Sequence, residues 1–323
     1  MGGPPSPRVR AKPIIPGTRY LVTRRCVERS YFLNPDEKNH KRLNNFIGYA
    51  LGVCLERYGI DLHAFVAMST HLHDNLTDVR GELPAFKTTF HAWLGRGINA
   101  LRGRSGNFWS GDQSVDVRPG DPRLDDDGND VPRTALDDLV YTLTNPVKDG
   151  ATRNGGRWPG FTTYGWKFGE TRTFKRPDWF FDPDNPNLPD QVDITLTRPK
   201  DVLPELDDEQ FYDELMRQVE AREREIKNDM RANNRRFKGK SRIFKQHWNH
   251  QATTPEARFK IAKRVRDRDP ERVRAALARD RAWRLLYADA RRRMLAGETD
   301  VEFPFGTWRM ARFAGVKVAN APP

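Results

Sequence analysis

Short extended segments alternate with amphipathic helices along the N-terminal part of the chain, and this order restricts the fold more than any other feature. Residues 18–26 carry β-branched and aromatic side chains and predict a strand, while apolar positions at helical spacing predict a helix over residues 36–58. Residues 61–77 predict extended chain in two halves around residues 68–70, and residues 83–101 predict a second amphipathic helix. We therefore expect strands and helices to combine in one domain.

Basic residues outnumber acidic ones, which bears on the partner. The chain of 323 residues carries 56 Lys and Arg against 44 Asp and Glu, for a formal net charge of +12. Such an excess favours a polyanionic partner, and nucleic acid is the leading candidate. The alternative is that the arginines only keep a helical surface soluble. Hydrophobic residues make up 37% of the chain, which is enough for a core of ordinary size.

The two cysteines and the hydropathy indicate a compartment. Cys26 and Cys54 form neither a CxxC pair nor a zinc-finger spacing, as is typical of proteins in a reducing environment. No stretch approaches roughly 18 consecutive apolar residues, and the N-terminus lacks the apolar run of a signal peptide. We therefore expect a cytoplasmic protein.

Four regions of different character follow one another along the chain. Residues 1–16, rich in Pro, Gly and Arg, predict a flexible basic tail, and residues 17–169 contain the alternating strands and helices. Pro, Asp and Asn crowd residues 170–206, which predict a linker with a weak strand at residues 192–196. Residues 207–323 are basic and mainly helical in composition, and predict a helical extension.

A third helix is predicted from Thr134 to Asn145. Thr134 and Asp137, three residues apart, form a capping-box pattern at its start. A residue before proline is pushed away from the helical conformation, so we expect the helix to end near Asn145 and Pro146. The apolar stripe of this helix consists of Leu136, Leu139, Val140 and Leu143.

Tyr141 and Asn145 lie one turn apart on a different face of this helix. A tyrosine beside an amide is suited to attack on phosphorus, with a metal ion that polarises the phosphate and an amide oxygen that helps to bind the ion. The residues alone leave a structural alternative open. In that alternative Tyr141 is a border residue of an amphipathic helix, and Asn145 is a C-cap before proline.

His71 and His73 are separated by one residue within the second extended half. Positions i and i+2 of a strand point to the same face, so both imidazoles can reach one divalent metal ion. Two surface or hydrogen-bonded histidines are the alternative, and the pair alone does not decide between the two.

Five pieces of the sequence resemble, in order, the single-tyrosine HUH transposases, and among these the branch of REP-associated tyrosine transposases. The pieces are RYLVTRRCVERSYFL, AFVAMSTHLH, an aromatic FW before a loop, LDDLVYTLTNPVKDGA and RWPGFTTY. Their order and approximate spacing agree over residues 17–169, about half of the chain. Five pieces in order are far more specific than any one of them.

The resemblance implies a ferredoxin-like α+β fold, in which an antiparallel sheet bears the histidine pair and the tyrosine helix packs so that its tyrosine faces the metal ion. Carried over residue by residue, it implies that Tyr141 is the nucleophile. It also implies that His71, His73 and Asn145 are the metal ligands. The family uses Mg²⁺ or Mn²⁺, which is consistent with a mixed imidazole and oxygen site.

A reaction and a partner are implied by the same resemblance. The tyrosine attacks a phosphodiester of single-stranded DNA and leaves a 5′-phosphotyrosine link and a free 3′-hydroxyl, which can later reverse the step at another end. Substrates in the family are typically single strands that bear a hairpin near the cut. Arg24 and Arg25 on the first strand are candidate phosphate contacts. The sequence does not decide between a monomer and a homodimer.

The sequence departs from the family pattern around the histidines. Thr70 stands where the family commonly has Asn, and Asp74 and Asn75 stand where apolar residues are usual. Asp74 would point to the face opposite His73, into the core, where it could loosen the strand. Residues 121–130 predict a solvated acidic insertion.

Two further hypotheses therefore stand beside the transposase. One is a catalytically degenerate, transposase-derived protein that only binds DNA through its basic half. The other is an HUH nickase of the replication or conjugation type, for which we would expect an attached helicase region, and none is visible.

Overall fold

The computed structural model describes residues 11–118, 135–200, 202–253 and 270–321. Within these residues, four strands form an antiparallel sheet in the order β2-β3-β1-β4. The strands are β1 (Thr18–Cys26), β2 (Ile60–Ala67), β3 (His71–Asp78) and β4 (Trp109–Arg118). The predicted α+β class with an antiparallel sheet is confirmed.

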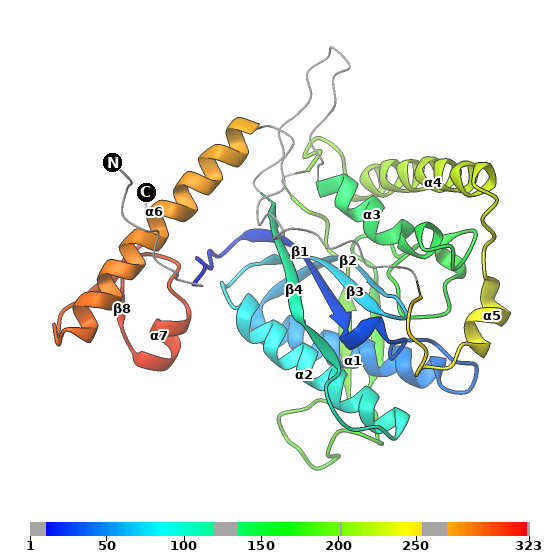
Figure 1. The fold of residues 1–323 in the computed structure, drawn as a ribbon, viewed down its shortest axis with the longest axis horizontal. Helices are drawn as coiled ribbons and strands as arrows, with labels where there is room; N and C mark the ends of the chain where they lie inside the picture. Colours follow the sequence, from blue (N-terminus) through cyan, green and yellow to red (C-terminus); the bar gives the residue numbers. More distant parts are fainter. Residues whose placement is uncertain (1–10, 119–134, 201, 254–269, 322–323) are drawn as a thin grey trace.

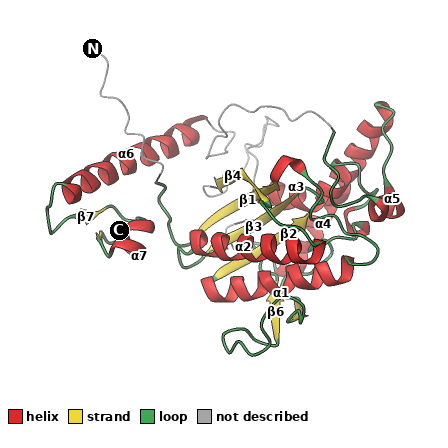
Figure 2. Ribbon diagram, turned by 60° about the horizontal axis from the view of Figure 1, so that its bottom comes forward, coloured by secondary structure: helices red, strands yellow, loops and turns green. Residues whose placement is uncertain are grey.

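Two helices lie on the same face of this sheet (Figures 1 and 2). Helix α1 (His40–Tyr58) connects β1 to β2, and α2 (Leu83–Arg102) connects β3 to β4. This order of elements, with the order of strands in the sheet, is the expected ferredoxin-like arrangement. Both helices end at a glycine in the left-handed conformation, Gly59 at φ 64° and Gly103 at φ 61°, which glycine adopts without the steric cost of a side chain.

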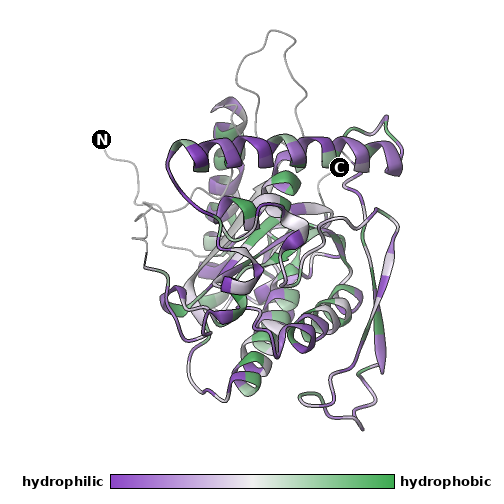
Figure 3. Cartoon of the chain, turned by 90° about the vertical axis from the view of Figure 1, so that its right-hand side faces the viewer, coloured by the Kyte–Doolittle hydropathy of each residue, from purple (hydrophilic) through white to green (hydrophobic). Residues whose placement is uncertain are grey.

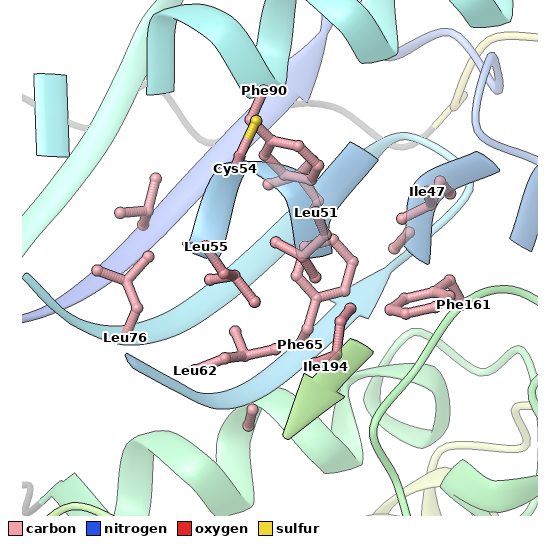
Figure 4. Packing of buried hydrophobic residues seen from close by; sticks show 14 of the residues in the cluster. Ile47, Leu51, Cys54, Leu55, Leu62, Phe65, Leu76, Phe90, Phe161 and Ile194 are labelled. Carbon is pink, nitrogen blue, oxygen red and sulfur yellow. The ribbon is translucent and has the colours of Figure 1, made fainter. Parts of the chain in front are cut away.

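The main core lies between the sheet and these two helices. Because side chains alternate along a strand, β3 sends Leu72 and Leu76 to this core and its histidines to the other face. Figure 4 shows Leu55 of α1, Phe65 of β2 and Leu76 among the packed side chains. Burying one such side chain contributes about 1.5–3 kcal/mol, so this layer determines which face of β3 is left for a site.

Helix α3 (Ala135–Lys148) covers the histidine-bearing face, where it packs on β2 and β3. The predicted end of this helix at Asn145 is wrong by three residues, since Pro146 lies inside the helix. A proline lacks only its own backbone N–H as a donor, and here it falls in the last turn, where little helix remains to be disrupted. The buried side chain of Val147 also holds that turn in place. Thr134 of the predicted capping pair and the acidic insertion at 121–130 lie outside the described residues.

Helix α4 (Asp208–Ala232) packs on the outer side of α3. Its first turn has a capping box, in which the Asp207 side chain accepts from the Gln210 backbone and the Gln210 side chain accepts from the Asp207 backbone. The buried carboxylate of Glu223 accepts from the backbone N–H of Gly155 at 2.8 Å. Helix α4 is thereby tied to the loop that follows α3.

A hairpin covers the outer side of α1, where a linker was expected. Its strands are β5 (Thr171–Lys175) and β6 (Gln191–Thr195). A Cβ added at Gly48 of α1 would come within 2.3 Å of the Phe174 ring, so the glycine permits the close approach of the hairpin. Val192 and Ile194 alternate with exposed residues and enter the core. The weak strand predicted at 192–196 is thus β6, and it contributes to packing.

Further helices follow α4 within the described residues, in agreement with the predicted helical extension. The remaining elements are α5 (Gly239–Lys245), α6 (Pro270–Leu295), β7 (Glu302–Phe303), α7 (Arg309–Ala314) and β8 (Lys317–Val318), with short 3-10 turns η1 (Val27–Arg29) and η2 (Gly155–Arg157). Helix α6 lies with β7, α7 and β8 to one side of the sheet (Figure 1). Figure 3 shows hydrophilic and hydrophobic residues alternating along the ribbons of several helices. Among the described helices, none combines the length and apolar character needed to cross a membrane.

Candidate active site

Strand β3 presents its two histidines on the sheet face that α3 covers. His71 and His73 alternate with the core residues Leu72 and Asp74. The antiparallel register sets Thr23 of β1 opposite His73 and Arg25 opposite His71, and residues directly opposite each other share a face of the sheet. The candidate site therefore begins with two imidazoles, a hydroxyl and a guanidinium group from neighbouring strands.

The two imidazole rings lie next to each other and are held by hydroxyl groups. Their centroids are 4.8 Å apart, with the rings nearly perpendicular. The Thr23 hydroxyl and His73 Nδ1 share a hydrogen bond of 2.8 Å, and the Thr70 hydroxyl and His71 Nδ1 share one of 2.9 Å. Bonds of this kind orient the ring and select the tautomer of a metal-binding histidine.

Helix α3 brings Tyr141 and Asn145 to the histidine pair. The Tyr141 ring centroid lies 5.2 Å from that of His73, in an edge-on contact. The Asn145 side chain hydrogen-bonds to His71, and because this bond favours the protonated imidazole, the amide oxygen is the acceptor. The four site residues predicted from the sequence thus converge from two elements.

This donor set fits a divalent metal ion. Asn145 is 1% exposed, and its Nδ2 atom has no hydrogen-bond partner among the described residues, so the amide is held through its oxygen. Within the described residues no three His, Cys, Asp or Glu side chains are grouped to hold a metal ion. The amide oxygen of Asn145 lies beside His71 and is a candidate third ligand. Two imidazoles and one oxygen leave coordination positions for water or phosphate oxygens.

Burial and nearby charges act on the His71 ring. Burial lowers the pKa of His71, and the cationic side chains of Arg25 and Lys148 lower it further, while the carboxylate of Asp149 raises it. The sum lowers the pKa of His71 below its ordinary value. A neutral imidazole is the form that binds a metal ion.

Lys148 is a site residue that the sequence analysis missed. Its ammonium nitrogen lies 4.4 Å from the centroid of the Tyr141 ring. Tyr141, Asn145 and Lys148 are spaced four and three residues apart, so they share one face of α3. That spacing was visible in the sequence, but the expected helix end at Asn145 left Lys148 outside the helix.

Asn75 connects the histidine strand to the tyrosine helix. Its Nδ2 atom donates to the backbone oxygen of Asp138 at 3.1 Å and to the Thr142 hydroxyl at 2.5 Å, and both acceptors lie in α3. The side chain is 3% exposed. Asn75, a departure from the family pattern, therefore fixes the position of α3 relative to His73.

The two arginines considered as phosphate contacts lie on opposite faces of the sheet. Arg25 shares the face of the histidines, whereas the register pairs Arg24 with the core residue Leu72. The Arg24 guanidinium lies 5.8 Å from the Trp109 ring centroid, and its Nε atom is buried. Of the two, Arg25 alone is on the site face.

A buried polar group lies under the site, on the helix side of the sheet. Asp74 is fully buried, and neither of its carboxylate oxygens has a hydrogen-bond partner among the described residues. Burial raises the pKa of Asp74 well above its usual range, and burial lowers the pKa of Lys87 on α2 to about 8. Asp74 therefore does point into the core, as the strand alternation predicted.

The fold and the site define an α+β protein whose antiparallel sheet carries a histidine pair opposite a tyrosine on a packed helix. No protein-family model and no curated protein matches the sequence. Among solved structures, a REP-associated tyrosine transposase bound to a REP hairpin is similar at 17% identity and a TM-score of 0.35, over 49% of this chain and 82% of that chain. A Deinococcus radiodurans R1 protein, provisionally named a transposase, is similar at 14% identity and a TM-score of 0.26, over 36% of this chain and 87% of that chain.

Proposed function

We propose that this protein is a transposase that nicks and rejoins single-stranded DNA through a covalent 5′-phosphotyrosine intermediate on Tyr141, with a divalent metal ion, Mg²⁺ or Mn²⁺. His71, His73 and Asn145 would bind the ion. The proposal rests on the geometry of the site and on the five ordered sequence pieces that resemble the single-tyrosine HUH transposases.

One observation carries the proposal. The Tyr141 ring lies 5.2 Å from the His73 ring, on the same helix as the Asn145 amide that hydrogen-bonds to His71. A nucleophile must lie beside the group that neutralises charge on the phosphate, since positioning supplies much of the rate in such reactions. The predicted structural roles of Tyr141 and Asn145, a helix-border residue and a C-cap, do not require this convergence.

The proposed reaction exchanges one phosphodiester bond for another and needs no energy-supplying cofactor. The Tyr141 phenolic oxygen loses its proton and forms a bond to phosphorus, while the bond from phosphorus to the 3′ oxygen of the preceding nucleotide breaks. That oxygen gains a proton and becomes a free 3′-hydroxyl, and the DNA end stays on the protein as a phosphotyrosine diester. The reverse attack by a 3′-hydroxyl rejoins DNA and releases Tyr141, so one phosphodiester is exchanged for another.

Residues of this chain would perform separate parts of the step. Thr23 and Thr70 orient the two imidazoles. A bound divalent ion supplies positive charge that polarises the scissile phosphate. Lys148 adds a second positive charge beside the nucleophile. Asn75 holds α3 against the strand that carries His73.

The proposal is tested by incubating the protein with labelled, hairpin-bearing single strands and Mn²⁺ and resolving covalent adducts on a denaturing gel. We expect an adduct with the wild type and none with Tyr141→Phe or His73→Ala. Tyr58→Phe is the matched control, because Tyr58 hydrogen-bonds to Thr89 on the helix side of the sheet. An adduct that survives in Tyr141→Phe would contradict the assignment of the nucleophile.

A second candidate is the transposase-derived protein that binds DNA without cutting it. The buried Asp74 carboxyl favours it, because a polar group without a hydrogen-bond partner in the core weakens the strand that carries both histidines. This candidate predicts salt-sensitive binding of DNA and no adduct on any substrate with Mg²⁺ or Mn²⁺. An adduct with the wild type excludes it.

A further inference from the structure

The segment from Arg231 to Lys245 has a charge distribution found nowhere else in the described part of the chain. It contains seven basic residues, and no Asp or Glu occurs between residues 230 and 255. The seven are Arg231, Arg235, Arg236, Lys238, Lys240, Arg242 and Lys245, and all are exposed. We call residues 231–245 the basic arm.

The cations of the basic arm lack acidic partners within the part of the chain that the structure describes. Among the described residues, the structure contains no ion pair with any of the seven. The long helix α6 differs, because its arginines are paired in several places. Its pairs are Arg274 with Glu271, Arg284 with Asp280, Arg292 with Asp289, and Arg293 with Glu298. Within the described residues, no carboxylate therefore offsets the positive charge of the arm.

The basic arm is fixed to the candidate active site. The backbone N–H groups of Lys238 and Gly239 donate to the oxygens of Gly150 and Ala151, each at 2.9 Å, just beyond the end of α3. Gly150 is two residues past Lys148, whose ammonium lies over the Tyr141 ring. The middle of the arm therefore lies beside the loop that directly follows the tyrosine helix.

The far end of the arm is anchored at the end of the sheet next to His71. Ile243 is 1% exposed and packs with Met68, which lies in the turn between β2 and β3. The Asn34 side chain donates to the backbone oxygens of Ile243 and Gln246, at 3.0 and 2.9 Å. Such anchoring holds the arm in place before any ligand binds, which lowers the entropic cost of binding.

Aromatic rings are interleaved with the cations of the arm. Lys238 lies 5.5 Å from the Tyr31 ring centroid, and Lys240 lies 5.2 Å from that of Phe244. Arg153, in the loop after α3, lies 5.8 Å from the centroid of the Phe237 ring. A row of exposed cations with half-buried aromatic rings suits unpaired nucleic acid, which offers phosphates to the cations and base faces to the rings.

We propose that the basic arm binds the phosphates of single-stranded DNA next to the scissile position, and that α6 does not. The inference deepens the proposed function by naming the surface that holds the strand. The partner is identified by its chemistry, a flexible polyanion with exposed bases. Duplex DNA, with its bases stacked, is the weaker ligand of this surface.

Binding can be tested without the cutting step. In a Tyr141→Phe background with EDTA, fluorescence anisotropy would report the affinity for a labelled single strand over a range of salt concentrations. The arm variant replaces Arg235, Arg236, Lys240 and Arg242 by glutamine. The matched control replaces the exposed α6 residues Arg279, Arg281, Arg291 and Arg292 by glutamine and so removes the same charge.

We expect the arm variant to bind single-stranded DNA at least about tenfold more weakly at moderate salt. The magnitude of the slope of the logarithm of the binding constant against the logarithm of the salt concentration should decrease by about three, since each lost phosphate contact removes ~0.7 from that slope. The α6 variant should keep the wild-type slope. Double variants at Arg235 with Arg236 and at Lys240 with Arg242 should each lose about half of the effect, and circular dichroism should show them folded.

Three results would overturn the inference: an unchanged slope in the arm variant, an equal loss in the α6 variant, or an equal loss of affinity for a duplex of the same sequence. None of these depends on cleavage. If the wild type forms no adduct and the arm variant binds DNA more weakly, the proposed function alone is refuted. If the arm variant binds DNA normally and the protein with Tyr141 intact forms an adduct, the proposed role of the arm alone is refuted.

Discussion

The His73 ring is held between a hydroxyl on one side and an aromatic ring on the other. Thr23 bonds to Nδ1 at 2.8 Å, and the edge-on Tyr141 ring lies 5.2 Å away. The Lys148 ammonium lies over the Tyr141 ring, at 4.4 Å from its centroid. A cation at this position can offset negative charge on the attacking oxygen and the phosphate as the new bond forms.

Replacement of Lys148 by methionine should slow adduct formation by about tenfold to hundredfold, because charge stabilisation in the transition state is lost. The affinity for Mn²⁺ should not change, since Lys148 is not a proposed ligand. Single-turnover cleavage and Mn²⁺ titration measure the two quantities separately. Lys148→Arg should restore most of the rate, and Lys41→Met, at an exposed position of α1, is the control. A loss of Mn²⁺ affinity in Lys148→Met would point to a structural role instead.

His91 gives a second prediction at the level of single residues. Burial and the cationic groups of Arg24 and Lys87 lower the pKa of His91 well below its ordinary value, and its Nε2 has no hydrogen-bond partner among the described residues. As pH falls below about 6.5, the unfolded chain takes up a proton at His91 that the folded protein does not. The contribution of this residue to stability is therefore present at neutral pH and is lost on acidification.

We expect the free energy of unfolding of the wild type to decrease as the pH is lowered from about 6.5 to the pKa that His91 has in the folded protein. This decrease should be steeper than that of His91→Leu by up to about 1.4 kcal/mol per pH unit. Urea unfolding at a series of pH values measures both curves. Parallel curves for the two proteins would show that His91 is not the source of the pH dependence.

At the scale of elements, the site depends on the contact between β3 and α3. Asn75 makes the side-chain hydrogen bonds of this contact, and the last turn of α3 is held by Val147 against α4. The positions of β1, α1, α2 and the β2–β3 pair could be predicted from the sequence, because periodicity and glycine C-caps determine them locally. The end of α3 could not, because burial of Val147 outweighs a single proline in the last turn.

In the site, too, features set by local sequence could be predicted and features set by distant contacts could not. The spacing of His71 and His73 on a strand, and of Tyr141 and Asn145 on a helix, predicted which side chains share a face. The role of Asn75 could not be predicted, because its partners Asp138 and Thr142 lie more than sixty residues away along the chain. Long-range hydrogen bonds of this kind leave no local pattern.

Replacing Asn75 by alanine should lower the free energy of unfolding by about 1–3 kcal/mol, since two buried hydrogen bonds are lost. Adduct formation should slow as well, because α3 is no longer fixed relative to His73. Hydrogen exchange should rise in α3. Asn45→Ala is the matched control, since Asn45 bonds to the backbone oxygen of Lys175 in the hairpin, far from the site. An Asn75→Ala protein with unchanged cleavage would contradict the positioning role.

At the scale of the whole molecule, segments distant in sequence come together around the four-stranded sheet and its helices. The backbone N–H of Ile14 donates to Gly306 at 2.9 Å, so part of the region expected as a tail at 1–16 pairs with the C-terminal unit. Trp308 Nε1 donates to the Glu82 carboxylate at 3.1 Å and links that unit to the start of α2. Composition predicted a basic helical extension, but not that the basic arm, whose cations form no ion pair among the described residues, lies beside the tyrosine helix.

The most direct test of the account is to locate the covalent bond by mass spectrometry. After reaction with single-stranded DNA and Mn²⁺, nuclease and trypsin digestion should yield the peptide from Thr134 to Lys148 with a nucleotide on its one tyrosine, although the chain contains eight tyrosines. We predict the modification at Tyr141 alone. A nucleotide on any other residue would contradict the account, because the histidine pair, Asn145 and Lys148 would then surround a tyrosine that does not react.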